Sequence, residues 1–281
     1  MAGCALLWST GGLGIKLVSW NPMAIAGTRS LIAGLVLLAY LFLRQGGPRI
    51  RNWPLQLAGG LAYAGTMLCY VASVKLTTAA NAILLQYTSP VFTAILGWLI
   101  LRERVSWLDW VSMAGVMVGM VIFFLEKLTF AGTWGNVLAI TSGILFSLTF
   151  VLVRKQREGS AVESLAAGHF ITFLVTIPFL AAGGGPEGMG PGAWGWVGLA
   201  YLGSVQVGLT GVLMSYALRY VSALQSMLVS LIEPILTPVW VFLFVREVPS
   251  PAAIAGGLII VGIVAARSAL SLRIAQTVEG R

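Results

Sequence analysis

The chain of 281 residues is 58% hydrophobic and only 9% charged, whereas an ordinary soluble domain has about 25% charged residues. So few charged side chains cannot cover a water-exposed surface, which excludes a soluble globular protein and makes lipid the solvent. The net charge of +8 comes from short segments between apolar stretches, without a basic patch that interleaves aromatic residues, so we set nucleic acid aside as a partner.

A helix needs about 20 apolar residues to cross a bilayer, and the sequence holds ten stretches near this length. In chain order they are Ala2–Val18, Met23–Leu43, Pro54–Val74, Ala79–Leu101, Trp107–Leu125, Thr133–Val153, Glu163–Ala182, Ala193–Leu218, Ala223–Val245 and Pro251–Ser268. The first stretch has neither a basic start nor a small-residue cleavage site, so we expect a span and not a removed signal peptide. The sequence therefore predicts an all-α membrane protein with ten transmembrane helices.

Basic residues are distributed unequally between the two sides of these spans. If both termini are cytoplasmic, only Lys75, Lys127 and Arg246 fall in outside loops. The inside segments then hold twelve basic residues: Arg44, Arg49, Arg51, Arg102, Arg104, Arg154, Lys155, Arg157, Arg219, Arg267, Arg273 and Arg281. Because Lys and Arg concentrate in cytoplasmic loops, we expect both termini in the cytoplasm.

The sequence repeats itself at a fixed spacing. Pro90 matches Pro234 at an offset of 144 residues (234 − 90), and Arg102–Glu103 matches Arg246–Glu247 at the same offset. At this offset Ser89 is the counterpart of Glu233. The repeat predicts two related halves, residues 1–128 with spans one to five and residues 129–281 with spans six to ten.

An odd number of spans in each half inserts the second half upside down relative to the first. Inverted repeats of this kind are typical of secondary transporters, whose substrate site lies near the midplane between the halves. Some channels and membrane enzymes share the architecture, so the repeat alone leaves these classes open.

Spans four and nine each carry a central proline and close on Arg-Glu, span one reads LLWSTGGLGIK, and span two has Arg29 near its start. These blocks resemble the EamA-type branch of the drug/metabolite transporter superfamily over essentially the whole chain. The resemblance implies two inverted five-helix repeats around a central cavity, lined mainly by spans one, three, four, six, eight and nine. It also implies export of amino acids or other metabolites, as in the similar YddG-like amino-acid exporters, across a bacterial cytoplasmic (inner) membrane.

The chain departs from two other branches of this superfamily. Its later spans lack the intramembrane lysine pair that phosphate-sugar carriers use, which argues against phosphorylated substrates. It is also far longer than the four-helix multidrug members, so we expect one polypeptide to suffice and the protein to function as a monomer in lipid.

Glu233 is the sharpest functional candidate, since it lies about 15 Å into its span at 1.5 Å per residue. An ionisable group at that depth is costly unless it faces a cavity or a partner. It either binds a substrate amine, or acts as a protonation switch, or hydrogen-bonds to backbone freed beside Pro234. Pro90 and Pro234 each remove a backbone hydrogen bond in mid-span, which makes them either gating hinges or fixed kinks.

Other candidates are aromatic and polar residues near the middles of spans, the usual lining of a small-molecule site. As substrate-binding residues we predict Trp8, Ser9, Tyr63, Tyr70, Gln86, Tyr87, Phe146, Tyr201, Gln206 and Ser230, together with Glu233. Each of them alone has helix packing as its alternative role. We interpret Arg29 and His169 as structural.

The leading functional hypothesis is a secondary transporter that exports small metabolites, above all neutral and aromatic amino acids. The alternative is a proton-coupled multidrug efflux pump for hydrophobic or cationic compounds. The sequence has no nucleophile–base pair and no cluster of His, Cys or carboxylates, so we expect no enzyme, no metal and no cofactor.

Overall fold

The computed structural model describes residues 1–11, 18, 20–129, 131–159, 161–181, 192–246 and 250–279. Every regular element in these residues is helical, and nine of the helical segments there are long and apolar enough to cross a membrane. The expected first span begins as α1 (Ala2–Ser9), and its residues 12–17 lie outside the described residues. The protein is therefore an integral membrane protein whose described residues form only helices and their connections.

The remaining elements follow the predicted spans closely. They are α3 (Pro22–Gln45), α4 (Trp53–Leu76), α5 (Ala79–Gln86), α6 (Ser89–Leu96), the π-helical η1 (Gly97–Leu101), α7 (Trp107–Phe124), the 3₁₀ turn η2 (Leu125–Lys127), α8 (Thr133–Lys155), α9 (Ala161–Ala181), α10 (Gly192–Tyr201), the π-helical η4 (Leu202–Leu209), α11 (Thr210–Tyr220), α12 (Ala223–Ser230), α13 (Glu233–Val245) and α14 (Pro251–Glu279). The predicted last span, Pro251–Ser268, agrees with the apolar part of α14, Pro251–Leu270, while the helix itself continues to Glu279. Apolar length predicts where lipid ends, whereas residues 269–279 keep good helix formers and contain no Gly or Pro.

Side-chain caps fix where several helices begin. Asn21 accepts a hydrogen bond from the backbone N–H of Met23 at 2.9 Å and is followed by Pro22, which needs no backbone donor at the first helical position. Ser106 and Asp109 form a reciprocal capping box at the start of α7. Such caps satisfy N–H groups that a helix start leaves unpaired, and each contributes about 1 kcal/mol.

Spans four and nine are interrupted in their middles. α5 ends before Tyr87 and α6 begins at Ser89, while α12 ends at Ser230 and α13 begins at Glu233. Pro90 and Pro234 occupy the second position of α6 and α13. At the start of a helix the missing N–H of proline costs nothing, whereas in the middle of a continuous helix it would remove one hydrogen bond.

The same local structure recurs at the offset of 144 residues. The side chains of Thr78 and Ser222 cap α5 and α12 in the same way, each accepting from the N–H three residues later. Arg102 and Arg246 end the two spans with φ of 56° and 61°, the left-handed conformation that non-glycine residues rarely adopt. The repeat in sequence is therefore also a repeat in backbone conformation.

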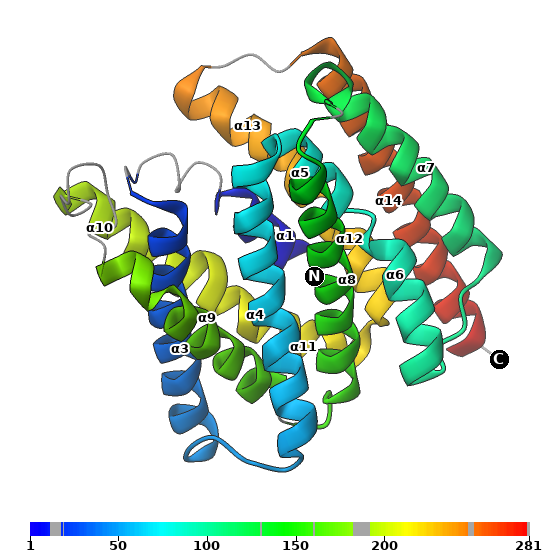
Figure 1. Ribbon diagram of the computed structural model, residues 1–281. Coiled ribbons are helices and arrows are strands. Elements are labelled where there is room, and N and C mark those ends of the chain that lie inside the picture. Colours follow the sequence, from blue (N-terminus) through cyan, green and yellow to red (C-terminus); the bar gives the residue numbers. More distant parts are fainter. Residues whose placement is uncertain are drawn as a thin grey trace.

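Helix packing joins elements that are distant in the chain. α4 packs against α8 and α9, α3 against α9 and η4, and α7 against α14, which together form one edge of the bundle in Figure 1. α1 crosses α13, and α6 lies against α8 and α12. Spans one, four, six and nine therefore lie next to one another.

The crossing of α7 and α14 depends on two glycines. A Cβ added at Gly256 would lie 2.5 Å from both the carbonyl oxygen of Gly119 and the backbone nitrogen of Phe123. Backbones approach this closely only where small residues meet, as is usual between membrane helices.

We expect Gly256→Ala to lower the stability of the protein by about 1–3 kcal/mol, because the added methyl overpacks this crossing. Thermal unfolding of the purified protein in detergent measures the effect. Gly262→Ala in the same helix is the matched control, since a Cβ there meets nothing within 4 Å. Equal melting temperatures for the two variants would contradict the packing argument.

Candidate functional site

The interrupted middles of spans four and nine are joined by one hydrogen bond. Tyr87 Oη donates to Glu233 Oε2 at 2.7 Å. Tyr87 is buried and directly follows α5, whereas Glu233 is partly buried and is the first residue of α13. Because both residues lie at a break in a span, the bond places a carboxyl and a phenol together deep within the apolar part of the fold.

Small residues of α8 hold the break in span four. A Cβ added at Gly143 would lie 2.6 Å from the carbonyl oxygen of Gln86, the acceptor that Pro90 leaves without its helical donor. The Gln86 side chain donates to Ser142 Oγ at 2.8 Å, and Ser147 Oγ donates to the carbonyl of Ser89 at 2.7 Å. The two hydrogen bonds satisfy polar groups that lipid cannot, and Gly143 lets α8 approach closely enough to form them.

The break in span nine is held by α1. Thr237 Oγ1 donates to the carbonyl of Ser9 at 3.2 Å, and Trp240 Nε1 donates to Ser9 Oγ at 2.8 Å. Ser9 is fully buried. The predicted site residue Ser9 therefore contacts the helix that Glu233 begins, one and two turns beyond Glu233.

Trp8 of α1 belongs to a group of aromatic side chains. Its ring lies 6.4 Å from Phe146 and 6.5 Å from Phe150, and its Nε1 donates to Thr210 Oγ1 at 3.0 Å. Gln206 Nε2 donates to the carbonyl of Trp8 at 3.3 Å, while its buried Oε1 has no partner among the described residues. Trp8, Phe146 and Phe150 share one apolar cluster with Tyr63.

Five side chains from α3, α4, α13 and the break in span four interact electrostatically, and we call them the central charge cluster: Arg29, Tyr63, Tyr70, Tyr87 and Glu233. Arg29 interacts with Tyr63, Tyr70 and Glu233, and Tyr70 and Tyr87 both interact with Glu233. The cluster brings one cation and one carboxyl to the same region, with phenols between them.

Two predicted site residues lie apart from this cluster. Tyr201 is 37% exposed and shares a hydrogen bond of 2.9 Å with Thr10 Oγ1. Ser230 is fully buried and donates to the carbonyl of Met227 within its own helix. In this conformation neither side chain forms a hydrogen bond with Tyr87 or Glu233.

The site residues predicted from the sequence do not include Thr210, Thr237 or Trp240, and Arg29 is interpreted there as structural. Thr237 and Trp240 follow Glu233 by four and seven residues, a spacing that places all three on one face of a helix. From that spacing the sequence could have predicted these two residues near the site. For Thr210 and Arg29 the signal is tertiary, because their partners are more than 30 residues away in the chain.

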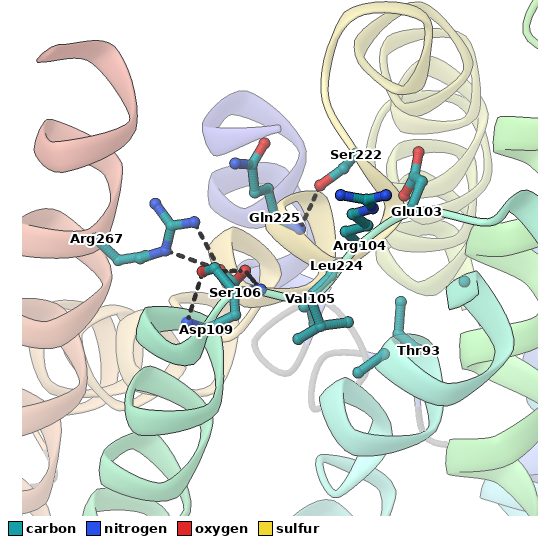
Figure 2. A pocket seen from close by; sticks show the side chains of 12 residues that line it. Thr93, Glu103, Arg104, Val105, Ser106, Asp109, Ser222, Leu224, Gln225 and Arg267 are labelled. Atoms are coloured by element: carbon teal, nitrogen blue, oxygen red, sulfur yellow. Dashed lines mark hydrogen bonds and ion pairs between the residues drawn. The ribbon is translucent and has the colours of Figure 1, made fainter. Parts of the chain in front are cut away.

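A pocket of about 310 Å³ lies at the end of the bundle where the arginines concentrate, and its lining is shown in Figure 2. It lies between the start of α7, the start of α12 and α14, and is distinct from the Tyr87–Glu233 pair. Arg267 and Asp109 form an ion pair across it, with Nη2 and Oδ1 2.7 Å apart.

A second ion pair at this end joins α8 to the segment that follows η1. Arg154 Nε lies 3.0 Å from Glu103 Oε1, and Arg154 Nη1 donates to the carbonyls of Leu218 and Arg219 at 2.6 and 2.8 Å. Glu103 Oε2 accepts from the backbone N–H of Ala223 at the start of α12. A carboxylate there is favourable because a helix N-terminus carries partial positive charge. The Arg154–Glu103 pair therefore holds the connection between α11 and α12 against the end of span four.

In the part of the chain that the structure describes, no three or more His, Cys, Asp and Glu side chains are grouped so as to hold a metal ion. The arrangement offers reversible binding groups instead: a carboxyl, a guanidinium, phenols and aromatic rings within a membrane-embedded helical bundle. Such a fold and site define a membrane transporter.

Comparison with known proteins identifies the family. The chain matches the EamA-like transporter family over residues 1–125 and 133–267, and it belongs to that family, which is part of the drug/metabolite transporter superfamily. The resemblance inferred from the sequence is confirmed at this level.

Individual relatives agree with the family. Uncharacterized transporter YdfC of Bacillus subtilis is 26% identical over 265 residues, which cover 91% of this chain and 85% of the relative. An uncharacterized transporter of Archaeoglobus fulgidus is 29% identical, with 90% and 91% of the two chains covered. Human solute carrier family 35 member G1 is 24% identical, with 92% and 74% covered.

A solved crystal structure shares the fold. It superposes with a TM-score of 0.83 at 21% sequence identity, covering 97% of this chain and 96% of the other. At that identity the match concerns the fold alone.

We expect the Arg154–Glu103 pair to couple energetically. Arg154→Gln and Glu103→Gln should each lower the free energy of unfolding, because each leaves a partly buried charge unpaired, and the double variant should lose less than the sum by about 0.5–3 kcal/mol. SDS-induced unfolding in mixed micelles measures the cycle. The control cycle uses Arg104→Gln in place of Arg154→Gln. Arg104 follows Glu103 in the chain, is exposed and forms no ion pair with a described carboxylate. Equal coupling in both cycles would refute the assignment.

Proposed function

We propose that this chain is a secondary transporter that exports small metabolites, above all neutral and aromatic amino acids, across the cytoplasmic membrane by alternating access. The observation that carries the proposal is the hydrogen bond between Tyr87 and Glu233 at the breaks of spans four and nine. Broken spans with polar groups at membrane depth are the usual substrate sites of transporters built from repeats.

Ten spans in two inverted halves, residues 1–128 and 129–281, fit the packing. If span n of the first half corresponds to span n + 5 of the second, α3 and α9 are counterparts that pack together, as are α7 and α14. The contact of α4 with α9 has its counterpart in that of α3 with η4. The same exchange relates the contacts α1–α13 and α6–α8. This symmetry supports a rocking of one half against the other about a central site.

The side chains around Glu233 favour an amphipathic solute. Trp8, Phe146 and Phe150 offer aromatic surface, and Glu233 is a carboxyl at mid-span that can bind an ammonium group. A neutral amino acid with an apolar side chain combines these two features. The YddG-like amino-acid exporters, which the repeat blocks resemble, are the corresponding group within the family.

The alternative is a proton-coupled efflux pump for hydrophobic or cationic compounds, in which Glu233 would carry the proton. Arg29 argues against it, because its positive charge interacts with the Glu233 region and would repel a permanently cationic drug. The central charge cluster favours a solute that brings a negative charge as well as a positive one.

We further propose that the protein works as a monomer in a bacterial inner membrane with both termini cytoplasmic. Both partners of the central hydrogen bond come from one chain, so the site needs no second copy. Large apolar side chains such as Leu43, Leu258 and Phe244 are exposed on the outside of the bundle and suit contact with lipid.

Proteoliposomes preloaded with phenylalanine should release it in a saturable manner. Glu233→Gln should slow release about tenfold or more, because it removes the charge that binds the ammonium group, and Tyr87→Phe should slow it several-fold by freeing the carboxyl it orients. Tyr220→Phe is the matched control, since Tyr220 is 71% exposed. Equal rates in all three variants would refute the site, and dye efflux that requires a pH gradient, without amino-acid release, would favour the alternative.

A further inference from the structure

Arg29 is a cation in a membrane span without an anionic partner among the described residues. It is the eighth residue of α3, about 10 Å from the start of the helix at 1.5 Å per residue, and it is partly buried. Its one hydrogen-bond partner in the described part of the chain is the thioether of Met67, with Nη2 and Sδ 3.6 Å apart. A thioether is a weak acceptor, so the guanidinium is left with donors that a stronger acceptor could use.

An unpaired charge at this depth is costly, and such residues mark substrate or ion pathways in membrane proteins. Arg29 is directed into the bundle, because it is partly buried and its Nη2 lies 3.6 Å from Met67 Sδ of α4. Tyr63 and Tyr70 of α4 and Glu233 of α13 lie within electrostatic range of its charge. Phenols are hydrogen-bonding groups but not anions, so they do not neutralise the guanidinium. The charge of Arg29 is therefore held inside the bundle without a neutralising contact.

Glu233 is the obvious counter-charge, yet it does not form an ion pair with Arg29. The ion pairs between described residues with nitrogen and oxygen within 4.0 Å are Arg154–Glu103 and Arg267–Asp109. Glu233 instead accepts a hydrogen bond from Tyr87. Arg29 and Glu233 thus influence each other electrostatically without being in direct contact.

We infer that Arg29 binds the carboxylate of a zwitterionic substrate whose ammonium group is bound by Glu233. The inference rests on the proposed function and adds to it the residue that binds the carboxylate, so that a free carboxylate becomes a requirement for the substrate. A zwitterion is the ligand that satisfies both charges at once. The guanidinium suits the task because its planar donors match the two oxygens of a carboxylate.

The aromatic residues supply the third part of the site. Tyr63 and Met67, next to Arg29, contact the same apolar cluster as Trp8, Phe146 and Phe150. A substrate whose headgroup lies between Arg29 and Glu233 can therefore place an apolar side chain against this cluster. Large neutral side chains should bind better than small or charged ones.

Three ligands with the same phenyl ring separate the two charge contacts. Phenylalanine carries both charges, phenethylamine only the ammonium, and 3-phenylpropanoate only the carboxylate. Isothermal titration of the purified protein in detergent should give the tightest binding for phenylalanine. Each single-charge ligand should bind at least about tenfold more weakly than phenylalanine, because one charge-assisted contact is missing and one protein charge is left unpaired.

Two variants should then change the affinities for the three ligands in opposite patterns. Arg29→Gln should weaken phenylalanine and 3-phenylpropanoate by about 10- to 100-fold and leave phenethylamine unchanged, whereas Glu233→Gln should weaken phenylalanine and phenethylamine and leave 3-phenylpropanoate unchanged. Unchanged binding of one ligand also demonstrates that the variant is folded. Arg29→Lys should recover only part of the carboxylate binding, because Lys lacks the planar fork.

Arg44→Gln is the matched control, since Arg44 lies in the same helix, is exposed and belongs to its last turn. It should leave all three affinities unchanged. The inference is overturned if Arg29→Gln binds phenylalanine as tightly as the unaltered protein, or if phenethylamine and phenylalanine bind the unaltered protein equally. Arg29-dependent binding of phenylalanine without release from proteoliposomes would keep this assignment and refute the proposed transport.

Discussion

The helices of spans four and nine are each interrupted just before a proline, Pro90 or Pro234, and much of the site's arrangement follows from these two breaks. Inside a bilayer each freed carbonyl needs a partner from the protein. Gly143, Ser142 and Ser147 of α8 supply close approach and hydrogen bonds at the first break, and Ser9 of α1 contacts the helix beyond the second. Spans one and six are thereby drawn to the breaks, which brings four spans together at membrane depth.

This constraint explains why polar groups gather in the middle of an apolar bundle. A break exposes the ends of two short helices, and a carboxyl at the first position of α13 lies at an N-terminus, where negative charge is favoured. Tyr87 immediately follows α5 and reaches that carboxyl. The positions that the prolines disrupt are thus the positions where ligand-binding groups are least costly to place.

Sequence reasoning reached the spans, the repeat and the family because hydropathy, charge alternation and a constant offset are local or periodic signals. It also predicted Glu233, Tyr87 and Ser9 as site residues, and the structure places Tyr87 in a hydrogen bond with Glu233 and Ser9 against α13. It treated Arg29 as structural, because an arginine near a helix start usually reaches the interface. Only packing places Arg29 in contact with Met67, and only packing pairs the exposed Tyr201 with Thr10.

The two halves share caps, breaks and left-handed ends at one offset, yet they differ where Ser89 is the counterpart of Glu233. The side chain of Ser89 is fully buried and donates to Met227 Sδ, so the first break holds no charge. If the halves exchange roles during transport, as their symmetric packing suggests, the scaffold is the same on both sides but the charges are not. In that proposed motion Glu233 would move with residues 129–281 and Arg29 with residues 1–128. A zwitterion held between them would therefore join the two halves, whereas without it the separation of the charges leaves each half free to move.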